Sequence, residues 1–445
     1  KAEKGGFAVG GLSTSSKLAG EEYLKITRQN TRINIADDGT KAEKGGFAVG
    51  GLSTGKGSPD FFNINIDTTG TVFPAQNRIL WYPLKNAFLT GKVLIISKDS
   101  VGENSFASGY ESKAIGKYSQ ALGYQARAFG NNSTAIGYLA TANAANSFAF
   151  GDNAKATGVG SYAFGSMGRD TTDGSSTGNP AWASGDYSMA IGLGAKANSL
   201  GSYAIGTNTS ADGQYSMVLG ENSSGGTKSY VFGKNCHAPT QVALAMGINC
   251  VAETPNAVAI GIAAESRGDM YGSFAFGYKV KANGAGSSAF GYQSTASGAY
   301  SMAFGYNTSA TTTNATSFGY STTASGRYSF ATGFYSTTTG DASLASGKYV
   351  TAYSAFETVL GSYSTTYTPT STTAWSATDR LFVLGNGASS GARSNALTVL
   401  KNGNVGIGIE DPTSVLHVTA EGAKTDSYSG LYFTNSATSS TAAKT

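Results

Sequence analysis

The sequence predicts an all-β protein built as a parallel β-roll, in which short strands form a coil whose turns repeat at a fixed interval. Three observations predict it: a glycine recurs at a constant spacing, a small residue lies two places before that glycine, and large apolar residues flank the small one. The chain has 445 residues with 61 Gly, 8 Pro and 11% aromatic residues, and 13% are charged. This composition favours a packed structure with a core of small residues over a disordered tail.

The glycine repeat begins near Gly102 and closes the pattern Ser-aromatic-Ala-aliphatic-Gly at every fourteenth position, as from Gly109 to Gly123. A second glycine lies halfway in some repeats, at Gly116, Gly130 and Gly158. The halfway glycine divides the fourteen-residue repeat into two segments of seven residues. This division predicts two short strands and two tight turns, with glycine at the positions that need φ > 0. The closing glycines are Gly109, Gly123, Gly137, Gly151, Gly165, Gly192, Gly206, Gly220, Gly233, Gly247, Gly261, Gly277, Gly291, Gly305, Gly319, Gly333, Gly347 and Gly361.

The residues before each closing glycine fall on two faces, because strand side chains alternate. Alanine lies two residues before the glycine in most repeats, and Ser or Ala lies four before it, as at Ala204 and Ser202. A coil of two short strands has a narrow interior. We therefore expect this face of small residues to point inward.

The opposite face carries large apolar side chains one and three residues before the glycine. A monomer would expose them as a stripe beyond the few hundred Å² that soluble monomers tolerate. Self-association along the coil axis would bury the stripe, and cyclic symmetry would close the assembly. The pattern allows two-fold or three-fold symmetry. The predicted interface consists of Phe148, Phe150, Tyr162, Phe164, Met189, Ile191, Tyr203, Ile205, Met217, Leu219, Phe274, Phe276, Met302 and Phe304.

Other segments flank the coil. The stretch Lys1–Thr14 recurs unchanged at Lys41–Thr54, and alternating segments such as Phe61–Ile66 follow, which predicts strands with one buried face. The expected domains are therefore small tandem β modules over 1–73, a connector over 74–101, the β-roll over 102–361 and a second β region over 362–445. Because the sequence begins with Lys rather than Met, we expect a fragment or a processed chain.

Repeats such as Tyr187–Gly192 and Ser202–Gly206 closely resemble the head repeats of trimeric autotransporter adhesins of the YadA type. The resemblance covers roughly Gly102 to Gly361. It implies a left-handed β-roll and an elongated homotrimer around a central axis. It also implies a structural and adhesive role outside the cell, on a bacterial surface, with a host receptor or a surface glycan as the partner.

A second resemblance lies near the C-terminal end. Asn395–Gly408, followed by Asp411 and Pro412, is similar to the segment that often precedes the intramolecular chaperone domain of phage tail fibres and Bacteroidetes surface proteins. This resemblance supports an alternative function, a phage tail fibre on the virion that recognises a host glycan. A secreted polysaccharide lyase is disfavoured, because the interior is narrow and no carboxylate or basic cluster is present.

The longest break in the repeat is Ser166–Pro180. Function on a repetitive scaffold often lies where the repeat is broken. Arg169, Asp170 and Asp173 in this stretch, with Trp182 just beyond it, are therefore candidates for ligand contact. The alternative is a tolerated insertion in a surface turn.

Two shorter features are also candidates. Arg267, Gly268 and Asp269 form the integrin-binding tripeptide beside a two-residue insertion, although a polar turn centred on glycine is the alternative. Cys236 and Cys250 occupy the same position in successive coils, where strand spacing allows a disulfide. Free stacked thiols are the alternative.

The sequence predicts no enzyme and no cofactor. Gly225–Ser229 lacks the order of a phosphate-binding loop, and neither His237 nor His417 can be assembled into a Ser/His/Asp set. Two cysteines and two histidines match no standard metal site. The net charge of +4 favours no nucleic-acid partner, and no apolar run approaches the roughly 18 residues of a membrane span.

Overall fold

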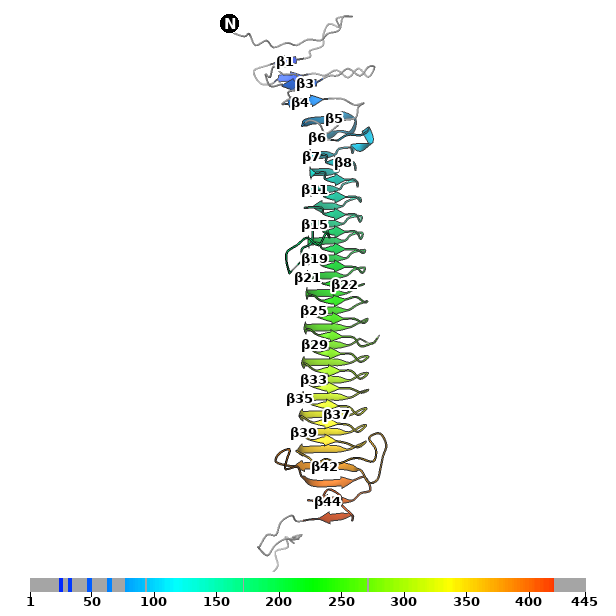
Figure 1. Cartoon of the computed structure of the whole chain (residues 1–445). Coiled ribbons are helices and arrows are strands. Elements are labelled where there is room, and N and C mark those ends of the chain that lie inside the picture. Colours follow the sequence, from blue (N-terminus) through cyan, green and yellow to red (C-terminus); the bar gives the residue numbers. More distant parts are fainter. Residues whose placement is uncertain are drawn as a thin grey trace, which may run out of the picture. The chain divides into compact units, whose positions relative to one another are not determined.

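The computed structural model describes residues 24–26, 31–33, 46–49, 62–65, 77–92, 94–170, 172–269 and 272–419. The chain forms two compact units, Lys1–Asn153 and Ala154–Thr445, and stacked coils of short strands make up most of the described part of each (Figure 1). Within the described residues the regular structure is almost all β. The helices there are two short 3-10 turns, η1 (Pro83–Lys85) and η2 (Lys98–Ser100).

The first unit starts with antiparallel pairs and continues as a parallel coil. Strand β1 pairs with β2, β3 with β4, and β5 with β6, all antiparallel. Strand β6 lies inside the expected connector over 74–101, and it already pairs in parallel with β7. The expected modules over 1–73 lie mostly outside the described residues. The strands are β1 (Leu24–Ile26), β2 (Thr31–Ile33), β3 (Gly46–Val49), β4 (Phe62–Asn65), β5 (Arg78–Tyr82), β6 (Ala87–Lys92), β7 (Phe106–Tyr110), β8 (Lys113–Ala114), β9 (Gln120–Tyr124), β10 (Arg127–Ala128), β11 (Thr134–Tyr138), β12 (Thr141–Ala142) and β13 (Phe148–Phe150).

The second unit has one parallel sheet of long strands and a facing parallel sheet of short strands. The long strands are β15 (Tyr162–Ser166), β17 (Met189–Leu193), β19 (Tyr203–Thr207), β21 (Met217–Glu221), β23 (Tyr230–Lys234), β25 (Leu244–Ile248), β27 (Val258–Ile262), β29 (Phe274–Tyr278), β31 (Ser288–Tyr292), β33 (Met302–Tyr306), β35 (Thr316–Tyr320), β37 (Phe330–Phe334), β39 (Leu344–Lys348) and β41 (Thr358–Ser362). The short strands are β14 (Lys155–Ala156), β16 (Trp182–Ala183), β18 (Lys196–Ala197), β20 (Ser210–Ala211), β22 (Ser224–Gly225), β24 (His237–Ala238), β26 (Val251–Ala252), β28 (Glu265–Ser266), β30 (Lys281–Ala282), β32 (Thr295–Ala296), β34 (Ser309–Ala310), β36 (Thr323–Ala324), β38 (Thr337–Thr338) and β40 (Thr351–Ala352).

The glycine register continues through the irregularities of the sequence. Gly220 pairs with Gly233 although the spacing there is one residue short, and Gly261 pairs with Gly277 across the two-residue insertion. The turns therefore absorb the changes in length, and the ladder of closing glycines stays aligned. The predicted parallel β-solenoid is confirmed in each unit.

The interior consists of the small residues that the sequence predicts. Ala204, two residues before a closing glycine, and Ser202, four before it, are both fully buried. The Ser202 hydroxyl donates to the carbonyl oxygen of Ser199 at 2.7 Å, and Ser188 donates to Gly185 in the same way. Both hydroxyls are thus satisfied by the adjacent turn, which offsets the cost of their burial.

The two kinds of glycine serve different purposes. The closing Gly206 has φ of +130°, as expected. The expectation of φ > 0 is wrong for the halfway position at Gly185, where the conformation is ordinary but a Cβ would lie 2.0 Å from the carbonyl oxygen of Ser199. Tyr187 and Asn208 take the left-handed conformations of this region instead, with φ of 54° and 52°. Close coil stacking, not backbone conformation, therefore selects the halfway glycines.

An irregular cap ends the stack in the second unit. Strand β42 (Arg380–Asn386) continues the parallel sheet after β41, and β43 (Asn395–Leu400) and β44 (Val405–Ile407) follow as antiparallel neighbours. Strand β45 (Leu416–Val418) pairs with β44. The rest of the expected region over 362–445, from residue 420 onward, lies outside the described residues.

Candidate interaction surfaces

The predicted interface residues all lie on the outer side of the long strands. Each is partly exposed to solvent, in contrast to the buried residues between them. Some of the rings stack along the coil axis, as at Phe290 and Phe304 with centroids 4.7 Å apart. The coil thus presents a stripe of large apolar side chains that repeats with every turn.

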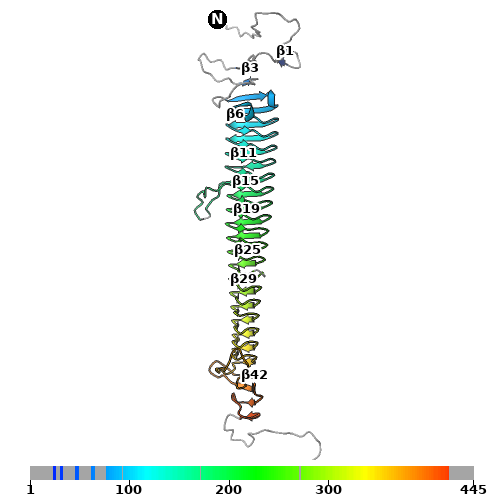
Figure 2. The same ribbon diagram turned by 90° about the vertical axis from the view of Figure 1, so that its right-hand side faces the viewer.

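The stretch after β15 forms a small hairpin that leaves the coil stack sideways (Figure 2). The Thr177 amide donates to the carbonyl of Gly168 at 2.9 Å, and the Asp170 amide donates to that of Ser175 at 2.7 Å. The Asn208 side chain donates to the carbonyl oxygen of Arg169 at 2.6 Å. This last bond fastens the hairpin to a later coil.

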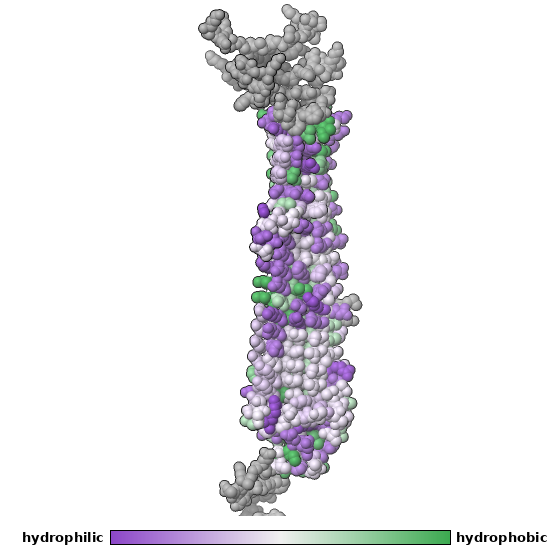
Figure 3. All heavy atoms as spheres, in the orientation of Figure 1, coloured by the Kyte–Doolittle hydropathy of each residue, from purple (hydrophilic) through white to green (hydrophobic). Residues whose placement is uncertain are grey.

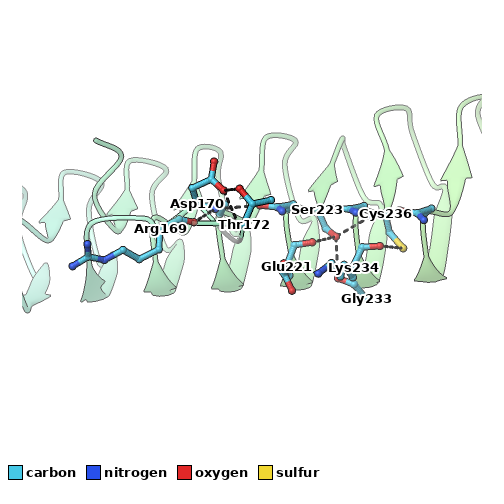
Figure 4. Close-up of polar contacts among 12 residues, drawn as sticks. Arg169, Asp170, Thr172, Glu221, Ser223, Gly233, Lys234 and Cys236 are labelled. Carbon is cyan, nitrogen blue, oxygen red and sulfur yellow. Dashed lines mark hydrogen bonds and ion pairs between the residues drawn. The ribbon is translucent and has the colours of Figure 1, made fainter. Parts of the chain in front are cut away.

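The two carboxylates of the hairpin stabilise its own turns. Asp170 accepts bonds from the hydroxyl and the amide of Thr172, and these bonds hold the pKa of Asp170 below its ordinary value. Asp173 accepts from the amide of Ser175 at 2.8 Å. Arg169 extends away from Asp170 and Thr172 in Figure 4, with its Nη1 3.4 Å from the carbonyl of Gly174. All three charged residues are exposed, and Arg169 is the one whose side chain has no carboxylate-type turn contact of its own.

Trp182 lies in β16 on the short-strand face, not in the hairpin. Its indole Nε1 donates to the hydroxyl of Thr157 at 2.9 Å. The Lys155 ammonium lies 5.8 Å from the ring centroid, a favourable cation–π arrangement. These contacts fix the exposed ring against the preceding coil.

The integrin-like tripeptide directly follows β28, at the start of the turn that carries the two-residue insertion. Gly268 holds a halfway position, where a Cβ would lie 2.0 Å from the carbonyl oxygen of Gly284. Arg267 Nε lies 3.1 Å from a carboxylate oxygen of Glu253 and 3.5 Å from one of Glu265. A receptor carboxylate would have to compete with both partners. The geometry therefore favours a polar turn.

Cys236 and Cys250 are free thiols in the interior, in successive coils. Each thiol points at a backbone carbonyl, that of Gly247 at 3.2 Å and that of Gly261 at 3.1 Å. The neighbouring Cys250 thiol and burial both raise the pKa of Cys236.

A buried charged cluster in the C-terminal cap was not expected from the sequence. Oxygen Oε2 of Glu357 accepts from the amides of Tyr353 and Ser354, both at 2.8 Å, and burial raises the pKa of this carboxyl. The buried guanidinium of Arg380 lies 4.1 Å from the ring centroid of Tyr367. Glu357 lies four residues before the closing Gly361, where other coils carry Ser or Ala, so this departure from the repeat was the available signal. Tyr367 and Arg380 follow the last closing glycine, where the sequence has no periodic signal.

Several columns of aromatic side chains were also not anticipated. The rings of Tyr278, Tyr292, Tyr306 and Tyr320 stack face to face in successive coils, at centroid distances of 4.7–4.9 Å. A tyrosine directly after the closing glycine was the available signal.

Among the described residues, no group of three or more His, Cys, Asp or Glu side chains could hold a metal ion.

A family model described as the YadA head domain repeat, in two copies, matches the coils of both units. The matched ranges are 100–126, 114–140, 130–154, 142–166, 172–195, 197–223, 282–308 and 310–336. The chain carries YadA head domain repeats. Residues 224–281, which fall between these ranges, contain the one-residue slip and the two-residue insertion, and they keep the same strand pairing as the YadA head repeats around them.

The YadA head repeats support a head of the trimeric autotransporter adhesin type. The repeat family and the β-solenoid are structural in kind. No curated protein matches the chain. Over the part of the chain that the structure describes, no helix has the length and apolar character needed to cross a membrane.

Proposed function

We propose that the chain is a structural and adhesive subunit of an extracellular homotrimeric fibre on a bacterial surface, where it mediates attachment. The outer stripe of large apolar side chains on the long strands carries this proposal. Phe274 and Phe276 in β29 are 46% and 51% exposed, and equivalent side chains follow in the next coils. Soluble monomers rarely leave a continuous apolar stripe of more than a few hundred Å² uncovered.

Burial of this stripe between copies would supply the energy of association. Full burial of one large apolar side chain contributes about 1.5–3 kcal/mol. Association costs about 4–15 kcal/mol in lost translational and rotational freedom. A few coils of the stripe per subunit would offset that cost, and the YadA head repeats favour three-fold symmetry over the two-fold alternative.

The hairpin Gly168–Asn179 is our candidate for the contact with a host receptor or surface glycan. Arg169 is exposed and offers a forked donor suited to carboxylates or sugar hydroxyls. Trp182 adds an exposed ring on the short-strand face. A trimer would present the hairpin three times, so weak single contacts would gain avidity if a ligand spans the copies.

Immunogold labelling of the source cells tests the location. An antibody raised against the purified chain should decorate fibres on intact cells. Labelling of virion tails would instead support the phage tail fibre, and labelling confined to the cell interior would contradict both functions.

A further inference from the structure

An exposed aromatic side chain recurs in every second coil near the C-terminal end of the second unit. Tyr300, Tyr328 and Phe356 each lie four residues after a short strand, and they are 48%, 64% and 46% exposed. The coils between them carry Asn314 and Ala342 at the same position. We call Tyr300, Tyr328 and Phe356 the aromatic column.

The backbone holds these side chains in line. All five positions have φ between 53° and 62°, and each amide donates to a carbonyl oxygen of the preceding coil at 2.7–3.0 Å. Because successive coils are about 4.8 Å apart, the aromatic residues repeat at about 10 Å. The column is therefore a straight row of rings with a fixed spacing.

The residues between the aromatic positions are smaller than the aromatic residues on either side. An earlier pair in the same unit shows the geometry directly: a Cβ added to Gly160 would lie 2.9 Å from the ring of Tyr187, and one added to Gly201 would lie equally close to Tyr215. These rings lie over the backbone of the preceding coil. Asn314 and Ala342 hold the same register position before Tyr328 and Phe356, but both carry the Cβ that these glycines lack.

The surface beside the aromatic column is neutral and rich in hydroxyl groups. The outward side chains of the neighbouring short strands and of the residues just after them are all Ser or Thr in four consecutive coils. Figure 3 shows pale coils toward this end and deeper purple in the coils before them. Arg327 and Asp341, next to the column, form an ion pair at 2.9 Å and so neutralise each other. The hydroxyl residues are Thr295, Ser297, Ser309, Thr311, Thr323, Ser325, Thr337 and Thr339.

A loop of the cap adds a fourth aromatic residue at the end of the column. Trp375 is 57% exposed, and its ring centroid lies 6.2 Å from that of Phe356. The loop is fastened to the coils by the amide of Asp341, which donates to the carbonyl of Thr372 at 2.7 Å. The row of rings therefore continues onto the cap.

We propose that the aromatic column, together with Trp375, binds a linear, uncharged glycan laid along the coil axis. The apolar faces of sugar rings stack on aromatic rings, and their hydroxyl edges hydrogen-bond to Ser and Thr. In an extended β-linked glycan with alternating ring orientation, every second sugar shows the same face, at a spacing comparable with that of the column. Several weak contacts on one polymer add up. The inference rests on the proposed function, because it names a partner class for the exposed fibre.

Two assays on the purified full chain test the inference. Depletion assays measure binding to microcrystalline cellulose and chitin, and affinity electrophoresis measures binding to soluble mixed-linkage β-glucan. Dextran sulfate is the anionic control. The test variant replaces all three column residues with Asn, the residue that the chain already carries at Asn314 with φ of 55°. Tyr118→Asn is the matched control. Tyr118 holds the same position in a coil of the first unit, but it is not part of a row of aromatic residues, because the residue two coils later is Asn146. Tyr328→Asn alone guards against damage to the cap near Phe356.

We expect the parent to bind at least one of the neutral polysaccharides, the triple variant to bind more than about tenfold more weakly, and Tyr118→Asn to bind like the parent. Circular dichroism and light scattering on the same samples report folding and oligomer mass. A parent that binds none of the neutral polysaccharides, or only dextran sulfate, overturns the inference, and so does a folded triple variant that binds like the parent. A monomeric parent would contradict the proposed function instead, whatever its glycan binding.

Discussion

Replacing Gly206 with alanine would place a methyl group inside the backbone of the next coil. A Cβ at this position would lie 1.9 Å from the carbonyl oxygen of Gly220, its partner in the parallel ladder. The φ of +130° adds strain for any residue with a side chain. That strain costs about 1–3 kcal/mol. Forcing two packed coils apart costs about another 1–3 kcal/mol.

Gly174→Ala is the matched control, because Gly174 lies in the hairpin with φ of +72° and nothing within 4 Å of an added Cβ. The control carries conformational strain without the clash. We therefore expect Gly206→Ala to be about 1–3 kcal/mol less stable than the control. Guanidinium unfolding followed by circular dichroism measures the difference. Limited proteolysis should also cut the variant near β19 and β21, because each coil is stabilised mainly by its neighbours. Equal unfolding midpoints for the two variants would refute the reasoning.

Three further predictions concern association, attachment and pH. Phe276→Asp should weaken the oligomer, because a buried charge in the stripe is unpaired, whereas Ser309→Asp on the short-strand face should not; light scattering across a dilution series distinguishes the two. Replacing Gly168–Asn179 with a short glycine-serine turn should reduce binding to host cells in a flow-cytometry assay while leaving the melting curve near that of the parent, and unchanged binding would remove the hairpin as a contact site. Glu357 has a folded-state pKa raised above the ordinary 4.5 by burial, so its contribution to stability is complete below 4.5 and is lost as the pH rises through the folded pKa. Glu357→Gln should therefore lose less stability than the parent when melting temperatures are compared from pH 4.5 upward, and parallel curves would count against a buried, titrating carboxyl.

The coil itself could be predicted from the sequence because steric limits repeat in every turn. Only small residues fit at positions such as Ala204, and only glycine fits at positions such as Gly206, so both left a period that can be counted. The stacking of the coils across the slip before Gly233 could not be derived in this way. It depends on turns that lengthen or shorten without moving the strands.

The candidate contact residues were harder to interpret, because their environment comes from other coils. Asp170 looked like a ligand-binding carboxylate, but its Oδ1 accepts from both the amide and the hydroxyl of Thr172 and stabilises the turn. Arg267 looked free to meet a receptor, but Glu253 lies one coil away and pairs with it. The aromatic column was present in the sequence as an even spacing at twice the coil period. The fourteen-residue period did not indicate which of the many Tyr and Phe side chains are exposed, so the column could not be distinguished from the other aromatic residues.

The mass of the purified chain in solution tests the central claim most directly. Multi-angle light scattering coupled to size-exclusion chromatography gives that mass without reference to molecular shape. The account predicts three times the 45.3 kDa of one chain, maintained on dilution, because the apolar stripe must be covered in the folded state. A folded species that remains at 45.3 kDa would contradict the account, since the stripe would then be stable in water and would not be an interface.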